Sequence, residues 1–189
     1  MTTFIIGVSG YAQAGKNTVG AVLNVRHEFA ERSFAEPMRE AIYKLNPAVP
    51  VAQGEYPWEP LRDLVDEYGW DKAKVDFPDI RRLLQVFGTE VGRKMFGEDF
   101  WVDQAFRGIK DLRQVVFTDT RFPNEAQRIK DNGGTVWRVT RPGVEATNGH
   151  ASETSLDDWN FDYVINNNST LEDLEVQVDN AVARIRRGL

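Results

Sequence analysis

The chain has 189 residues, no cysteine and a net charge of −6; 41% of its residues are hydrophobic and 28% are charged. This length and balance are typical of one globular domain with room for a small inserted subdomain. Disulfides, thiolate metal sites and a cysteine nucleophile are excluded, and the negative charge argues against binding to a nucleic-acid polymer. Because no apolar run approaches the roughly 20 residues that span a bilayer, we expect a cytoplasmic protein outside the membrane.

The most informative stretch covers residues 10–18, which fit the Gly-x-x-x-x-Gly-Lys core of a phosphate-binding loop. The apolar residues 3–8 before it suit a buried strand, and residues 18–23 after it can begin a helix. In this strand, loop and helix order, backbone N–H groups and the positive end of the helix dipole face a polyphosphate. We therefore predict an ATP-binding loop made of Gly10, Gln13, Ala14, Gly15, Lys16, Asn17 and Thr18, with Lys16 at the β- and γ-phosphates.

The loop departs from its consensus at one position. A serine or threonine that contacts Mg²⁺ normally follows the lysine, but here Asn17 follows it and the hydroxyl of Thr18 comes one residue later. Adenylate-kinase-like loops are similar in this respect, which favours a kinase of small metabolites over a GTPase or a motor ATPase. We predict that Thr18 serves Mg²⁺ directly or through water. A glycine-rich turn that binds no ligand is the alternative.

The middle of the chain is read as an insertion. Residues 29–34 predict a second strand, and residues 36–46 predict a helix with Pro37 near its first position. Residues 47–79 contain several prolines among aromatic residues, so we expect an irregular surface segment with one short helix over residues 61–68.

A longer helix is expected over residues 79–96, and its two faces differ. Ile80, Leu84, Phe87, Val91 and Met95 form the apolar stripe. On the opposite side, arginine, amide and hydroxyl groups share one narrow sector, which either faces solvent or binds a ligand. These polar residues are Arg82, Gln85, Thr89 and Arg93.

The second half of the chain alternates strands and helices, which predicts a parallel sheet. Residues 115–119 suit a buried strand that ends in Asp119, at the edge where α/β sheets bind ligands. An acid there can organise the Mg²⁺ shell, although Asp119 could instead cap the helix expected to begin at Asn124. Residues 132–134 should end that helix, and residues 135–140 should form the next strand.

The C-terminal part begins with a candidate lid over about residues 141–159, which contains His150 and Glu153 as expected hydrogen-bonding residues. Residues 161–165 predict the last strand. A capping box from Ser169 to Glu172 then predicts the start of a C-terminal helix. The side of this helix expected to be buried consists of Leu171, Leu174, Val178, Ala181, Val182 and Ile185.

Taken together, the chain resembles the phage-type deoxynucleoside monophosphate kinases. The resemblance is carried by residues 10–18, 34–39, 84–93, 118–125, 138–143 and 150–154. It implies a P-loop NTPase fold: a single α/β domain over residues 1–189, with a five-stranded parallel sheet flanked by helices. It also implies an acceptor-binding helical insertion at about residues 35–105 and transfer of the γ-phosphoryl group of ATP, with Mg²⁺, to a deoxynucleoside 5′-monophosphate.

The same resemblance implies roles for individual residues. Lys16, Asp119, Arg121 and Arg141 would act on the transferring phosphoryl group, with Asp119 arranging Mg²⁺ and water. The acceptor nucleotide would be bound by Arg39 and Arg93 at its phosphate, and by Gln85, Glu90 and Trp101 at its base or sugar.

Structural roles compete with some of these assignments. Arg39 could pair with Glu36 or Glu40 on its own helix, and Trp101 could belong to the core. Two rival functions also stay open: a P-loop kinase for another phosphorylated metabolite, of the dephospho-coenzyme A or phosphomevalonate type, and a slow nucleotide-binding switch. A homodimer is an open alternative to a monomer.

Overall fold

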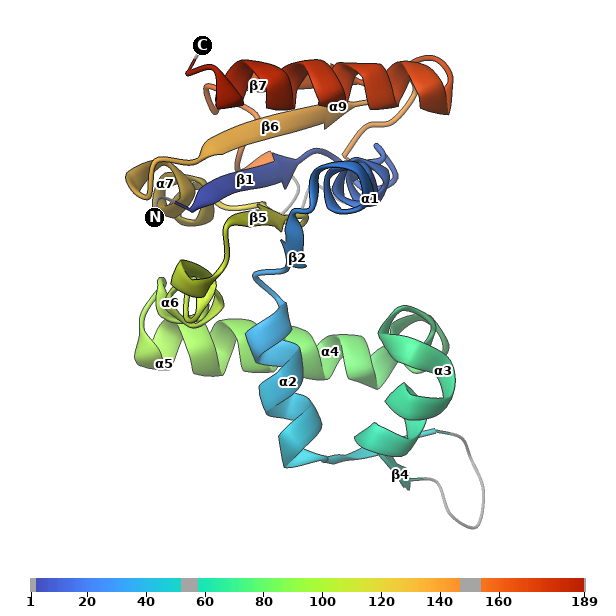
Figure 1. Cartoon of the computed structure of the whole chain (residues 1–189). Coiled ribbons are helices and arrows are strands. Elements are labelled where there is room, and N and C mark those ends of the chain that lie inside the picture. The colour runs from blue at the N-terminus through green and yellow to red at the C-terminus, as the bar shows by residue number, and fades with distance from the viewer. Residues whose placement is uncertain (1–2, 52–57, 147–153, 189) are drawn as a thin grey trace. The chain divides into compact units, whose positions relative to one another are not determined.

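The computed structural model describes residues 3–51, 58–146 and 154–188 (Figure 1). The chain divides into two compact units. Met1–Phe34 together with Phe106–Leu189 form the first unit, and Ala35–Ala105 form the second. Within the described ranges, no helix combines the length and the apolar character needed to cross a membrane.

The first unit is built on a five-stranded sheet. Its strands lie in the order β2-β5-β1-β6-β7, and each neighbouring pair is parallel. This arrangement confirms the predicted parallel sheet. The strands are β1 (Phe4–Ser9), β2 (Ala30–Arg32), β5 (Gln114–Phe117), β6 (Thr135–Thr140) and β7 (Tyr163–Asn166).

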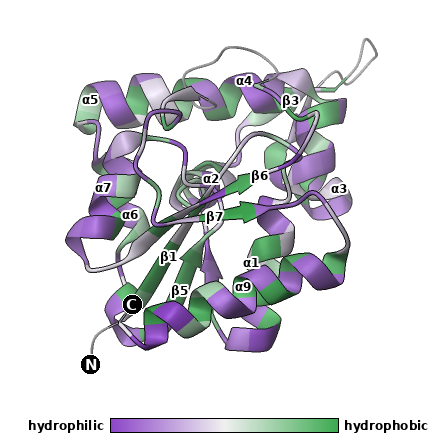
Figure 2. Ribbon diagram, turned by 90° about the horizontal axis from the view of Figure 1, so that it is seen from above, coloured by the Kyte–Doolittle hydropathy of each residue, from purple (hydrophilic) through white to green (hydrophobic). Residues whose placement is uncertain are grey.

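Helices pack on both faces of this sheet. Successive side chains of a strand point to opposite faces, and in β1 Ile6 and Val8 join a core cluster with residues of α1 (Lys16–His27) and α9 (Leu171–Arg186). On the other face, Ile129 of α7 (Pro123–Asp131) lies against Gly7 of β1. Figure 2 shows β1 and β5 as largely hydrophobic strands and α9 with both hydrophobic and hydrophilic residues. A short 3₁₀ helix, η2 (Ile109–Asp111), precedes β5.

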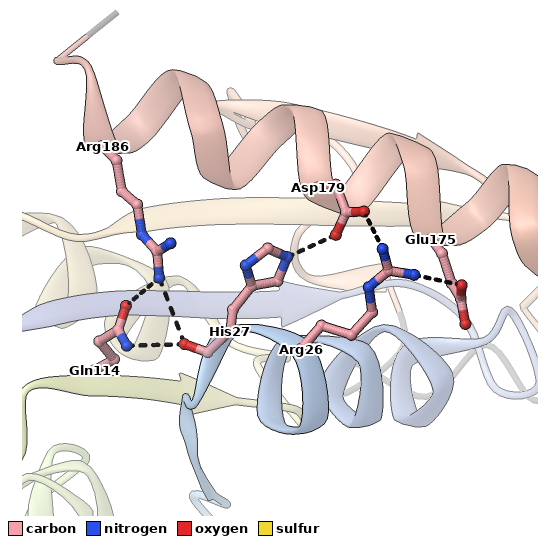
Figure 3. Close-up of polar contacts among 6 residues, drawn as sticks. All are labelled: Arg26, His27, Gln114, Glu175, Asp179 and Arg186. Atoms are coloured by element: carbon pink, nitrogen blue, oxygen red, sulfur yellow. Dashed lines mark hydrogen bonds and ion pairs between the residues drawn. The ribbon is translucent and has the colours of Figure 1, made fainter.

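Polar contacts attach α9 to the end of α1 (Figure 3). The guanidinium of Arg26 contacts carboxylate oxygens of Glu175 at 2.5 Å and Asp179 at 2.6 Å, and Nε2 of His27 lies 2.7 Å from the second oxygen of Asp179. The carbonyl of His27 also accepts hydrogen bonds from the side chains of Gln114 and Arg186. The helix that begins at the phosphate-binding loop is therefore fixed at its far end to the C-terminal helix.

The start of α9 differs from the prediction by one residue. Thr170 is the N-cap, and its hydroxyl accepts a hydrogen bond from the backbone N–H of Asp173. The carboxylate of Asp173 accepts a hydrogen bond from the Ser169 hydroxyl, so Asp173 takes the place predicted for Glu172. Hydrogen bonds from Ser169 and then Thr170 lower the pKa of Asp173. The predicted burial of Leu171 is wrong, because this first helical residue is 53% exposed; Leu174, Val178, Ala181 and Val182 are buried as predicted.

The second unit consists of helices and one short antiparallel pair of strands, β3 with β4. Its core joins Ile42, Leu61, Leu64, Ile80 and Leu84 from three of the helices. Its elements are α2 (Glu36–Leu45), β3 (Ala48–Pro50), β4 (Trp58–Pro60), α3 (Leu61–Asp76), α4 (Pro78–Val86), η1 (Phe87–Arg93), α5 (Lys94–Phe96) and α6 (Phe100–Ala105).

The expectation of an irregular segment over residues 47–79 is wrong for its described part. Strand β3 lies before residues 52–57 and β4 lies after them, and the two strands pair. Helix α3 extends for 16 residues, where only a short helix was predicted. Gly69 explains why the helix looked short: its φ of 71° and ψ of 158° kink α3 and interrupt the apolar period. Ala73 resumes the buried side beyond the kink.

The helix predicted over residues 79–96 forms, but it contains a π-helical segment, η1. Ile80 and Leu84 are buried as predicted, whereas Met95 is 71% exposed. The wider π turn advances each residue by less than the ~100° of an α-helix, so the apolar stripe changes phase across η1. Gly92 lies inside η1 and is buried.

Three stacked rings mark the places where the chain leaves and re-enters the first unit. Phe34 is the last residue before the second unit, and Phe106 is the first residue after it. Both rings stack on Phe117 at the end of β5, with centroid distances of 4.5 Å and 5.1 Å, and on each other at 6.2 Å. The guanidinium of Arg128 lies 5.8 Å from the Phe106 centroid.

Candidate active site

The predicted phosphate-binding loop connects β1 to α1 and has an unusual backbone. Gly10 has a φ of 141°, Gln13 a φ of 65° and Gly15 a φ of 110°. These positive angles favour glycine, and at Gly10 a side chain is also excluded because its Cβ would lie 2.4 Å from the carbonyl oxygen of Val139. The helix begins directly after Gly15, at Lys16, so the loop ends at a helix N-terminus that favours anions.

The ammonium group of Lys16 lies over this loop. Its Nζ atom donates hydrogen bonds to the carbonyl oxygens of Gly10 at 2.6 Å and Tyr11 at 2.8 Å. The side chain is therefore curled back across the loop, and its charge sits beside the backbone that would surround a phosphate group.

The carboxyl ends of the parallel strands meet at the edge of the sheet where this loop lies. The loop follows β1, Asp119 follows β5, Arg141 follows β6 and Asn167 follows β7. Ligands of open α/β sheets bind at this edge. The structure thus brings the predicted loop, acid and arginine to one edge of the first unit.

Asp119 is held by the segment that follows β2. One carboxylate oxygen accepts a hydrogen bond from the Ser33 hydroxyl at 2.6 Å, and the other accepts one from the Phe34 backbone N–H at 2.8 Å. Phe122 is the N-cap residue of α7. Glu125, which is only 5% exposed, caps that helix by accepting from the N–H groups of Arg121 at 2.7 Å and Phe122 at 3.0 Å.

A cluster around Arg138 contacts the loop from the side of β6. The guanidinium lies 5.0 Å from the ring centroid of Tyr11 and 5.3 Å from that of Phe161, and it donates to Asp157 at 2.7 Å. Asp157 also accepts a hydrogen bond from the Tyr11 hydroxyl at 3.0 Å. The sequence did not indicate this cluster, because its charged partners are 19 residues apart and the contact with Tyr11 spans 146 residues.

Asn167 contacts the loop from the side of β7 and was also missed. Its side-chain amide donates to the carbonyl oxygen of Ala14 at 2.9 Å, across 153 residues of sequence. Nothing in the sequence around residues 166–168 distinguishes this asparagine from its two neighbours.

In the second unit, Trp101 is a core residue. It is 9% exposed, and its indole N–H donates to the carbonyl oxygen of Gly88 at 2.9 Å inside η1. The ring also lies against Gly92, where an added Cβ would be only 2.0 Å from Nε1. The indole therefore holds the π-helical segment that contains Glu90 and Arg93, and its predicted contact with a nucleobase stays a prediction.

The other residues predicted to bind the acceptor lie on α2, α4 and η1. The Glu90 carboxylate accepts from Lys94 at 2.8 Å, Gln85 is exposed and Arg93 is partly buried. The charge of Arg39 contributes, after the larger effect of Lys74, to lowering the pKa of Asp71 on α3. The suggested partner Glu40 pairs with Lys44 instead, at 2.5 Å.

The predicted lid is only partly described. Arg141 and Arg121 are both exposed in the first unit. Residues 147–153, which include His150 and Glu153, lie outside the described residues. Within the described part, no three histidine, aspartate or glutamate side chains gather as a metal-binding group.

Comparison with known proteins identifies the family. The sequence model of the family described as deoxynucleotide monophosphate kinase matches residues 71–178. A candidate deoxynucleotide monophosphate kinase of Acanthamoeba polyphaga mimivirus is 30% identical, over 94% of this chain and 95% of the viral protein. The chain belongs to the deoxynucleotide monophosphate kinase family.

Other similarities agree with this assignment. The deoxynucleotide monophosphate kinase of Escherichia phage RB69 is 33% identical to this kinase over 65% of its chain and 50% of the phage protein. In fold, the kinase is similar to dephospho-CoA kinase from Campylobacter jejuni, with a TM-score of 0.50, 14% identity and 98% of each chain covered. This likeness supports the P-loop kinase fold.

Proposed function

We propose that this kinase transfers the γ-phosphoryl group of ATP to a deoxynucleoside 5′-monophosphate, forming ADP and the deoxynucleoside diphosphate. The observation that carries the proposal is the loop at the edge of the sheet, with the Lys16 ammonium 2.6 Å and 2.8 Å from two of its carbonyl oxygens. The family supports a nucleoside monophosphate as acceptor. We propose the cytoplasm, of an infected host if the chain is phage-encoded, as the place of reaction, in line with the viral relatives.

The reaction brings two anions together in line, so the site has to offset their repulsion and hold them in position. In the proposal, the loop N–H groups and Lys16 bind the donor phosphates, and Lys16 follows the charge as the phosphoryl group moves. Arg121 and Arg141 contact the transferring group. Arginine suits this role because its planar guanidinium can donate to two phosphate oxygens at once.

Mg²⁺ is the metal we propose, because the Asp119 carboxylate and the Thr18 hydroxyl are the hard oxygen donors that it prefers. Both lie at the edge of the sheet that carries the loop. When bound there with ATP, it would neutralise part of the phosphate charge. The Ser33 and Phe34 hydrogen bonds keep the Asp119 carboxylate oriented.

The acceptor specificity can be tested by measuring ADP release with each deoxynucleoside and ribonucleoside monophosphate, with dephospho-CoA, and with no acceptor. We expect turnover that requires a deoxynucleoside monophosphate. Turnover with dephospho-CoA alone would identify a kinase of another metabolite. ATP binding without acceptor-dependent turnover would identify a nucleotide-binding switch.

Replacing Arg93 by alanine should raise the KM for the acceptor by roughly tenfold to a hundredfold and change the KM for ATP much less. The reason is the loss of charged hydrogen bonds to the acceptor phosphate, each worth about 1.5–3 kcal/mol. Steady-state kinetics with each substrate varied in turn will measure the difference. Lys72→Ala removes an exposed positive charge from α3 of the same unit and serves as the control. Equal increases in both KM values would contradict the acceptor role of Arg93.

A further inference from the structure

A side chain at the end of β7 contacts one peptide of the phosphate-binding loop. Asn167 follows β7 directly, and its backbone N–H donates to the carbonyl oxygen of Thr140 at 2.7 Å. This bond continues the pairing of β6 with β7, in which Thr140 is opposite Asn166. The backbone at Asn167 is thus fixed by the sheet, so its side chain is presented from a rigid element.

From that position the Asn167 amide donates to the carbonyl oxygen of Ala14 at 2.9 Å. The approach is close enough that a Cβ at Gly15 would lie 2.5 Å from the donor nitrogen. A glycine at this position therefore leaves the space through which Asn167 reaches the loop. The contact is half-buried and joins the last strand to the residues directly before Lys16.

The hydrogen bond from Asn167 constrains the orientation of the peptide between Ala14 and Gly15. A trans peptide is planar, and its C=O and N–H bonds point in opposite directions. When Asn167 holds the Ala14 carbonyl on its own side, the N–H of Gly15 must point away from Asn167. Phosphate-binding loops depend on such N–H groups being turned toward the anion before it binds.

We infer that Asn167 is a positioning residue for ATP: by anchoring the Ala14 carbonyl, it directs the Gly15 N–H toward the bound phosphates. The inference rests on the proposed function, because it assumes that the loop binds ATP. It assigns Asn167 no contact with the adenine base. Its effect should therefore depend on the phosphates alone.

The experiment compares the binding of MgATP and of inorganic tripolyphosphate to the unaltered kinase and to Asn167→Ala, measured by titration calorimetry at constant salt. We expect both ligands to bind roughly tenfold more weakly to the variant, the effect of losing about one hydrogen bond. Affinity for the deoxynucleoside monophosphate should not change. Asn168→Ala, an exposed asparagine in the same turn, is the matched control and should bind both ligands normally.

Asn167→Asp is the second variant, which keeps the size of the side chain but has no amide donor. It should lose at least as much affinity as Asn167→Ala, and circular dichroism will verify that both variants are folded at the titration temperature. Unchanged affinity for both ligands, or a loss confined to MgATP, would overturn the inference. A lower melting temperature with normal affinity would indicate a purely structural role and would also overturn it. If the unaltered kinase binds neither ligand, the proposed function itself fails.

Discussion

Replacing Lys16 by alanine should lower kcat by about a hundredfold to a thousandfold or more, the usual effect of removing one group that stabilises charge in the transition state. The Lys16 ammonium lies against the loop carbonyls, and it is the one charged side chain within the predicted phosphate-binding loop. Without it, the migrating phosphoryl charge loses a counter-charge that the backbone N–H groups do not replace. A coupled assay of ADP release at saturating substrates will measure the change.

Two controls separate chemistry from folding in this experiment. Lys110→Ala removes an exposed positive charge from η2 in the same unit and should leave kcat unchanged. Circular dichroism of Lys16→Ala should give a melting temperature close to that of the unaltered kinase. More than a tenth of the original kcat in a folded Lys16→Ala variant would contradict the role of the lysine.

Replacing Gly92 by alanine should destabilise the second unit by about 2–4 kcal/mol, from overpacking and from loss of the indole hydrogen bond. The new Cβ would lie 2.0 Å from Nε1 and 2.5 Å from Cε2 of Trp101. The indole cannot move aside easily, because it is buried and bonded to the Gly88 carbonyl. The midpoint of urea-induced unfolding will measure the loss.

Gly88 provides the matched control in the same π-helical segment. An added Cβ there would meet the sulfur of Met38 at 2.6 Å, and a methionine side chain can change its rotamer. Gly88→Ala should therefore cost less than Gly92→Ala. Combining Gly92→Ala with Trp101→Phe should recover part of the stability, since the smaller ring leaves room for the methyl group. Equal losses at the two glycines would contradict the steric argument.

The sheet and the loop could be predicted because their signals are local. The apolar runs that form β1, β5 and β6 stand out by composition. Residues 10–18 contain a motif in which Gly10 and Gly15 are needed for the positive φ angles of the loop. The same is true of α2, where Pro37 lies at the start and Asn46 ends the helix with a positive φ of 49°.

The remaining features depend on contacts or backbone geometry that a local pattern does not encode. The π turn at residues 87–93 left no separate signature, so the apolar period was extended wrongly to Met95. The kink at Gly69 likewise interrupts the apolar period of α3, so its second half was not predicted as helix. In the candidate site, Asn167 and Asp157 contact residues of the loop that are far away in sequence, and the sheet brings them close because β7 pairs with β6, which in turn pairs with β1. The binding roles of Arg39 and Arg93 stay predictions.

The ring stack of Phe34, Phe106 and Phe117 has an evolutionary consequence. Phe34 and Phe106 flank residues 35–105 in the sequence and both stack on Phe117. The two ends of this insertion are therefore held next to each other by one group of rings. An insertion of this kind can change in length or sequence while the first unit keeps its own packing. If residues 35–105 bind the acceptor as predicted, a change of acceptor preference needs the replacement of only one contiguous gene segment.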